Sequence, residues 1–300
     1  METFDSESAL GQAIGYLVVG HGTRSPAGQS QLRRIFSQMT QLAGADGLKG
    51  RPAELAFLEL AEPNIMTAVE RLFQAGVQQL VVVPVLLFSA GHAQHDIPNV
   101  VEAAAERFGI NLLRNCSSLC LDPTILALSA ERFQQALLKH GGLGIEPAIE
   151  GVALALIGRG SRSDDATTAM LQFAELRTRA TPVRWSSVGF IHAQRPTVNE
   201  VLDALAATGL PWLVVQPHLL FEGDLIEELR REVEYRQSLS ASQKWIITET
   251  LGSTSLDQRL AAALSRLALQ STAPENDDGE SCARCQSPSH WCRVARTSAL

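Results

Sequence analysis

One sequence pattern occurs twice in this chain, and this duplication restricts the possible folds more than any other feature. Pro63 aligns with Pro196, and "QQLVVVPVLLF" aligns with "PWLVVQPHLLF", both at an offset of 133 positions. At the opening glycines, Gly20 and Gly158, the offset is 138, which places an insertion or deletion in the first helix or the loop after it. A repeat of this extent predicts two copies of one domain, which a chain of 300 residues can accommodate.

Each copy alternates short apolar runs with amphipathic helical patterns. In the first copy the predicted strands are residues 16–20, 54–59, 79–85 and 111–116, and the predicted helices are 29–42, 65–75, 97–108 and 123–138. In the second copy the predicted strands lie near residues 152–157, 185–190, 211–217 and 244–248. This alternation is typical of βαβ units, so the sequence predicts an α/β fold with a parallel sheet in each copy.

The predicted boundaries follow from the repeat and from local composition. The first domain is expected at residues 12–139 and the second at residues 150–270. The segment "HGGLGIEPAIEG" at residues 140–151 is rich in glycine and has a proline, as a linker is expected to be. Residues 271–300 form a tail that begins with "STAPENDDGES", a composition typical of flexible segments.

Charge and cysteine content exclude several classes of function. The net charge of −7 argues against nucleic acid as the main partner, because phosphate binding needs a basic surface. The beginning lacks the features of a signal peptide, and the longest apolar stretch, residues 80–88, is too short to span a membrane. Five cysteines, an odd number, fit a reducing compartment, so we expect a cytoplasmic protein without a membrane partner.

Residues able to bind a metal follow three of the predicted strands in the first copy. His21 stands between two glycines after the first strand, Glu59 ends the second, and "FSAGHAQHDIP" after the third contains His92, His95 and Asp96. The carboxyl ends of parallel strands meet at one edge, where ligands bind in open sheets. Imidazole suits first-row divalent metals, and a carboxylate serves as a ligand or a proton acceptor. Asp96 is also expected to cap a helix beginning at Ile97.

A purely structural explanation also accounts for each of these residues alone. His21 can be a turn residue, Glu59 can cap a strand end, and His92 can be an exposed loop residue. The second copy acts as an internal comparison: it has Arg159 in place of His21 and His192 in place of Glu59. The scaffold is repeated and the ligand set is not, which favours a functional site in the first copy.

The segments "VVGHGTR", "FLELAEP" and "GHAQHDIP" together resemble the class II chelatases that act on sirohydrochlorin, over residues 15–270. The resemblance implies two tandem chelatase-like domains, each a four-stranded parallel sheet flanked by helices, with the site in a cleft between them. It implies insertion of Co²⁺ or Fe²⁺ into a tetrapyrrole, in the cobalamin or siroheme pathway. His21 and His92 match the metal-handling histidines, and Glu59 matches the acidic residue that we expect to accept a proton.

Sirohydrochlorin carries many carboxylates, so basic groups are expected to orient it. The candidates are Arg24, Arg159, Arg162 and Arg195, because guanidinium pairs with carboxylate through two hydrogen bonds. An exposed surface position is the alternative for each of them. The sequence contains no phosphate-binding glycine motif, so no nucleotide is expected. Two halves in one chain can replace a dimer of single-domain forms, which predicts a monomer.

Three cysteines and a histidine lie close together in the tail. Cys282, Cys285, His290 and Cys292 fit a zinc site, and some long members of the chelatase family carry an iron–sulfur cluster on a similar Cys-x-x-Cys. A cluster has four ligands, so His290, another chain, Cys116 or Cys120 has to complete it. Free thiols remain the third option.

Two other functions are compatible with the same residues. A histidine after a strand also occurs in histidine phosphatases, but there an arginine precedes it, whereas Gly20 precedes His21 here. The other alternative is a non-catalytic protein that binds a metal or a tetrapyrrole for delivery.

Overall fold

The computed structural model describes residues 14–88, 92–116, 118–119, 121–141, 149–253 and 257–270; within these ranges, the side chains of residues 45, 92–95, 114, 115, 141 and 257 are outside this description. The predicted tail, with Cys282, Cys285, His290 and Cys292, lies outside the described residues, as does Cys120. No helix in the described part of the chain combines the length and the apolar character needed to cross a bilayer.

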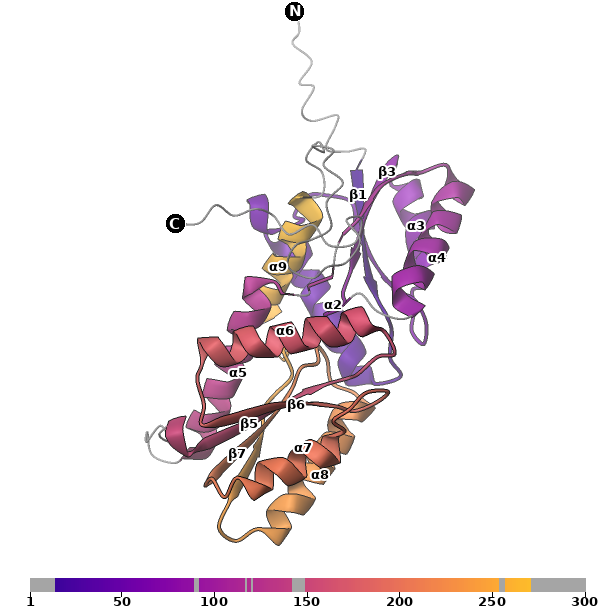
Figure 1. The fold of residues 1–300 in the computed structure, drawn as a ribbon. Coiled ribbons are helices and arrows are strands. Elements are labelled where there is room, and N and C mark those ends of the chain that lie inside the picture. The colour runs from indigo at the N-terminus through magenta and orange to yellow at the C-terminus, as the bar shows by residue number, and fades with distance from the viewer. Residues whose placement is uncertain are drawn as a thin grey trace, which may run out of the picture. The chain divides into compact units, whose positions relative to one another are not determined.

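Two four-stranded sheets confirm the predicted α/β fold (Figure 1). The first has the strand order β2-β1-β3-β4, the second has the order β6-β5-β7-β8, and every neighbouring pair is parallel. The strands of the first sheet are β1 (Ile14–Gly20), β2 (Ala53–Phe57), β3 (Gln79–Pro84) and β4 (Asn111–Asn115). Those of the second are β5 (Val152–Gly158), β6 (Trp185–Phe190), β7 (Trp212–Pro217) and β8 (Lys244–Ile247).

Helices cover both faces of each sheet, because the strands are apolar on both faces. The helices that follow strands in the first half are α2 (Pro26–Gln41), α3 (Ile65–Gln74), α4 (His92–Phe108) and α5 (Pro123–Gly141). Those in the second half are α6 (Asp164–Ala180), α7 (Val198–Ala207), α8 (Asp224–Leu239) and α9 (Asp257–Gln270). Two single-turn 3₁₀ helices, Gly44–Asp46 and Ile149–Gly151, complete the described elements.

Successive side chains of each strand point to opposite faces of the first sheet, so the core has one layer on each face. Leu17 and Val19 of β1 are fully buried against α3 and α4, in a cluster that includes Val69 and Val101. Side chains at alternate strand positions, such as Val18, point to the opposite face, where α2 and α9 pack. The same arrangement recurs in the second sheet, with α7 and α8 on one face and α5 and α6 on the other.

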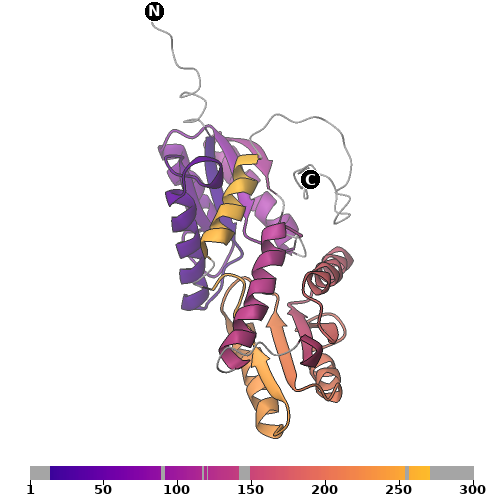
Figure 2. The same cartoon turned by 90° about the vertical axis from the view of Figure 1, so that its left-hand side faces the viewer.

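The last helix of each repeat belongs to the compact unit of the other repeat (Figures 1 and 2). Helix α9 lies beside α2 in both views and packs on β3, whereas α5 packs on α6 and β8. One unit therefore contains the described residues before Leu121 together with α9, and the other contains the described residues from Leu121 to Ser253. The boundaries predicted at residues 139 and 150 do not coincide with these units.

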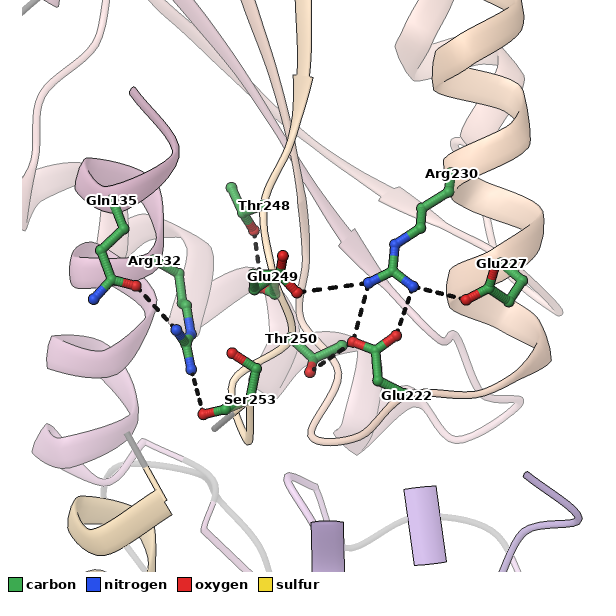
Figure 3. Close-up of polar contacts among 9 residues, drawn as sticks. All are labelled: Arg132, Gln135, Glu222, Glu227, Arg230, Thr248, Glu249, Thr250 and Ser253. Atoms are coloured by element: carbon green, nitrogen blue, oxygen red, sulfur yellow. Dashed lines mark hydrogen bonds and ion pairs between the residues drawn. The ribbon is translucent and has the colours of Figure 1, made fainter. Parts of the chain in front are cut away.

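Buried polar contacts explain why α5 joins the second unit. The Arg177 Nε group of α6 donates to Ser129 Oγ of α5 at 3.1 Å, and the Gln216 amide of β7 donates to the Ser129 carbonyl at 2.6 Å. Arg132 of α5 donates to the Ser253 carbonyl at 2.7 Å (Figure 3). The amphipathic pattern of α5 predicts a helix, but it does not show which of the two sheets the helix covers. These hydrogen bonds hold α5 against the second sheet.

The start of one helix in the first unit differs most from the prediction. Helix α4 begins at His92 rather than at Ile97, so Asp96 lies inside the helix and not at its N-cap. Pro98, which favours the first turn of a helix, lies further inside α4, and the helix runs through it with one backbone hydrogen bond fewer because proline lacks an N–H group.

Candidate functional site

The tips of β1 and β2 bring His21 and Glu59 together. Beyond the last paired residues of the two strands, Leu58 N–H donates to the Gly20 carbonyl at 2.9 Å and Glu59 N–H donates to the His21 carbonyl at 3.1 Å. The two side chains then meet, with 3.2 Å between His21 Nε2 and Glu59 Oε1. The His21 side chain is 32% exposed and that of Glu59 is 54% exposed, so both can be reached from solvent.

The two glycines around His21 have separate structural roles. A Cβ on Gly20 would lie 2.3 Å from Leu32 Cδ2 of α2, so Gly20 lets the helix pack closely on the strand tip. Gly22 has φ of +102°, and a Cβ there would lie 1.7 Å from the Glu59 carbonyl oxygen. Glycine is therefore required at Gly22 for the Glu59 loop to approach the β1 tip.

The turn after Gly22 is held by local polar contacts. Thr23 Oγ1 accepts from the Ser25 N–H at 3.1 Å, and Ser25 Oγ caps α2 by accepting from the Gly28 N–H at 3.3 Å. The Gln29 side chain donates to the Thr23 carbonyl at 2.8 Å. Arg24 is exposed on this fixed turn, next to the strand tip that carries His21.

The structure supports only part of the predicted set of ligands as a cluster. His92 and His95 occupy the first turn of α4, which follows β3, the strand beside β1, but their side chains are outside the described atoms. Within the side chains that the structure describes, no group of three or more histidine, cysteine, aspartate or glutamate residues is arranged to hold a metal. The joint role of His21 and His92 thus stays a prediction.

The second unit repeats the backbone of this site with different side chains. Ile191 N–H donates to the Gly158 carbonyl at 3.0 Å, and His192 N–H donates to the Arg159 carbonyl at 2.9 Å. Gly160 has φ of +82°, and a Cβ there would lie 1.9 Å from the His192 carbonyl oxygen. Arg159 and His192 thus occupy the positions of His21 and Glu59, and both are exposed.

The predicted arginines differ in their surroundings. Arg159 and Arg162, like Arg24, are exposed, and among the described residues none of these three forms an ion pair. Arg195 pairs with Glu200 at 3.3 Å. The pKa of the Glu200 carboxyl is lowered by hydrogen bonds from Thr197 and by the positive charge of Arg195. Together these effects are larger than the desolvation that opposes them. Any carboxylate that binds Arg195 has to compete with Glu200.

An ion-pair network that the sequence did not lead us to expect lies at the carboxyl edge of the second sheet (Figure 3). Arg230 of α8 holds Glu222 through two hydrogen bonds of 2.6 and 3.1 Å and also contacts Glu227 at 2.7 Å. Thr250 donates to Glu222 at 3.3 Å. Burial opposes the charge on Arg230, but the glutamates outweigh it and raise the pKa of the guanidinium. The arginine thus connects the loop after β7 with the loop after β8. In the sequence, the spacing of Glu222 and Arg230 in "EGDLIEELR" is the pattern from which their contact could have been predicted.

Comparisons with known proteins identify the family and the fold. The sequence model of the CbiX family matches residues 15–136 and 153–268. Sirohydrochlorin ferrochelatase of Bacillus subtilis (strain 168) is 31% identical over 224 residues, which cover 74% of this chain and 79% of that protein. Sirohydrochlorin cobaltochelatase of Priestia megaterium is 27% identical, covering 73% and 68%. The solved structure of SirB from Bacillus subtilis with Fe³⁺ has a TM-score of 0.72 and 26% identity, covering 87% of this chain and 96% of that one.

Proposed function

Because the chain belongs to the CbiX family, we propose that it inserts a divalent metal ion, Co²⁺ or Fe²⁺, into sirohydrochlorin. The curated relatives named for this reaction align with most of the chain. The observation that carries the proposal is the pair of His21 and Glu59, whose side chains meet at 3.2 Å at the carboxyl edge of the first sheet. The matching positions of the second unit carry Arg159 and His192, so the two copies are not equivalent in chemistry.

The reaction makes two demands on the protein. One metal ion enters the macrocycle, and the two protons on its pyrrole nitrogens leave. We assign the first task to His21, because a neutral imidazole binds Co²⁺ and Fe²⁺ and can release them to another nitrogen ligand. We assign the second to Glu59, because its carboxylate is exposed and lies beside the same imidazole, where it can accept a proton. The ligand set has to leave a coordination position open for the ring nitrogens.

His92 is proposed as the second metal-handling residue. Support comes from the backbone: α4 begins at His92 and follows β3, the neighbour of β1 in the sheet. We expect the variant His92→Ala to lose metal insertion while the protein remains folded.

The substrate carboxylates are assigned to the arginines at the strand tips. Arg24, Arg159 and Arg162 support this proposal best, because they are exposed. Arg195 is the weakest member of the set, since Glu200 already contacts it.

The test is a multiple-turnover assay with purified full-length protein, sirohydrochlorin, and Co²⁺ and Fe²⁺ supplied separately and in competition. The visible spectrum reports the metallated product. Product beyond one equivalent per chain supports catalysis, and binding without turnover would instead support a delivery protein. Hydrolysis of a phosphate ester without metal insertion would support the phosphatase alternative. The competition also decides between the two metals.

Three further proposals concern the whole protein. We propose a monomer, because the chain contains both copies of the domain, and a cytoplasmic location. For the cysteine tail we propose a metal group, zinc or an iron–sulfur cluster, held by Cys282, Cys285, His290 and Cys292. Metal analysis and the visible spectrum of the full chain, compared with those of a Cys282→Ser, Cys285→Ser variant, test the tail. Light scattering tests the oligomeric state.

A further inference from the structure

Arg33 links the two ends of the loop that carries Glu59. It lies on the exposed side of α2 and donates a hydrogen bond from Nη2 to the carbonyl oxygen of Glu62. Its guanidinium carbon is also 5.2 Å from the centroid of the Phe57 ring, a cation–π distance. Phe57 is the last residue of β2 and is buried, so one arginine contacts a fixed anchor before Glu59 and the backbone after it.

Residues 58–63 of this loop form no helix or strand, and a hydrogen bond of 2.9 Å from the Phe57 N–H to the Pro63 carbonyl also joins the two ends of the loop. Its first two N–H groups bond to the tip of β1, as described above, and Glu62 Oε2 accepts from the Asn64 N–H at 2.8 Å, where α3 begins. Between these anchors, Leu60 adopts φ of +62°, a conformation that a leucine rarely takes. The position of Glu59 therefore depends on contacts that hold this strained segment in place.

The second repeat shows that this link is specific to the first. Helices α2 and α6 match at an offset of 138, and their buried positions correspond, for example Ile35 and Phe173. Arg33 then corresponds to Leu171, which is 49% exposed. The equivalent loop of the second unit is tied from its neighbouring turn instead, since Gln194 Nε2 donates to the Ser161 carbonyl at 2.9 Å.

We infer that Arg33 is a positioning residue for Glu59: it fixes the loop between Phe57 and Glu62 and so holds the carboxylate at His21. This inference rests on the proposed role of Glu59 in metal insertion. Arg33 acts through the loop and does not touch the reacting groups. Its loss should therefore reduce the rate of the chemical step and leave substrate binding largely unchanged.

The test compares two variants, Arg33→Leu and Arg107→Leu. Leucine is the residue at the position of the second repeat that matches Arg33. Arg107 is also exposed and lies 5.8 Å over a phenylalanine ring, that of Phe108, but on α4. Full-length variants are assayed for kcat and KM, and hydrogen–deuterium exchange is measured on the peptide that covers residues 58–64. We expect Arg33→Leu to lower kcat by about tenfold with KM for sirohydrochlorin within about twofold, and to speed exchange in this peptide. Arg107→Leu should change neither, and Arg33→Lys should recover part of kcat.

Equal kcat in Arg33→Leu and Arg107→Leu would overturn the inference, as would a loss of kcat with unchanged exchange at residues 58–64. Glu59→Gln, assayed in parallel, separates this failure from failure of the proposed function. If Glu59→Gln loses turnover while Arg33→Leu retains it, only the role of Arg33 is wrong. If Glu59→Gln retains wild-type turnover, the role of Glu59 is wrong, and the inference about Arg33 falls with it.

Discussion

Gly22→Ala tests whether the close approach of the Glu59 loop to the tip of β1 places Glu59 beside His21. A Cβ at this position would lie 1.7 Å from the Glu59 carbonyl oxygen, whereas real Cβ atoms stay at least 3.0 Å from such a neighbour, so the two have to separate by about 1.3 Å. The His21 and Glu59 side chains are 3.2 Å apart, and a shift of this size breaks their contact. Misplacement of a reacting group by about 1 Å can cost about 100-fold in rate, and we expect a loss of kcat of that order.

Gly76→Ala is the matched control for backbone strain. Gly76 has φ of +82°, but a Cβ there meets nothing within 4 Å. Both variants should lose about 1–2 kcal/mol of unfolding free energy because alanine disfavours this conformation. Gly22→Ala should lose about 1–3 kcal/mol more, because the added atom overpacks the loop. Urea unfolding and the chelation assay together measure both effects. Wild-type kcat in Gly22→Ala, with a stability loss no larger than that of Gly76→Ala, would show that Gly22 does not set the position of Glu59.

Two further predictions concern the polar core of the second unit. Burial lowers the pKa of His218 from 6.5 to about 3, so between these values the unfolded chain binds one proton more than the folded one. Stability should fall as the pH falls through this window, by up to about 1.4 kcal/mol per pH unit, and His218→Val, which copies Val85 at the matching position of the first repeat, should remove this part of the slope. Equal slopes for the two proteins in urea unfolding at pH 7 and 5.5 would contradict this assignment. Arg177 is fully buried, and burial lowers its pKa to about 10. Ser129→Ala, which deprives the guanidinium of an acceptor, should cost about 1–3 kcal/mol in the same assay, and Arg177→Met, which copies Met39 of the first repeat and removes the buried charge together with the contact, should cost less.

Much of the fold could be predicted because the duplication and the alternating patterns are local signals. The strand at residues 185–190 has the predicted bounds, and the position of Glu59 beside His21 follows from the parallel order of β1 and β2. The pairing of α5 with the second unit could not be predicted, because it depends on contacts such as Arg132 with Ser253, which are 121 residues apart. The role of Arg33 was missed for a similar reason: an exposed arginine on a helix carries no local signal of what it contacts.

We expect the metal chemistry to belong to the first repeat, although both repeats share the same backbone geometry at the strand tips. The most direct measurement is the steady-state chelation rate of two variants at equivalent positions, His21→Ala and Arg159→Ala. We predict that His21→Ala has no measurable turnover, while Arg159→Ala keeps kcat and has a raised KM for sirohydrochlorin. Full turnover in His21→Ala, or equal loss of kcat in both variants, would show that the first repeat does not carry the metal chemistry.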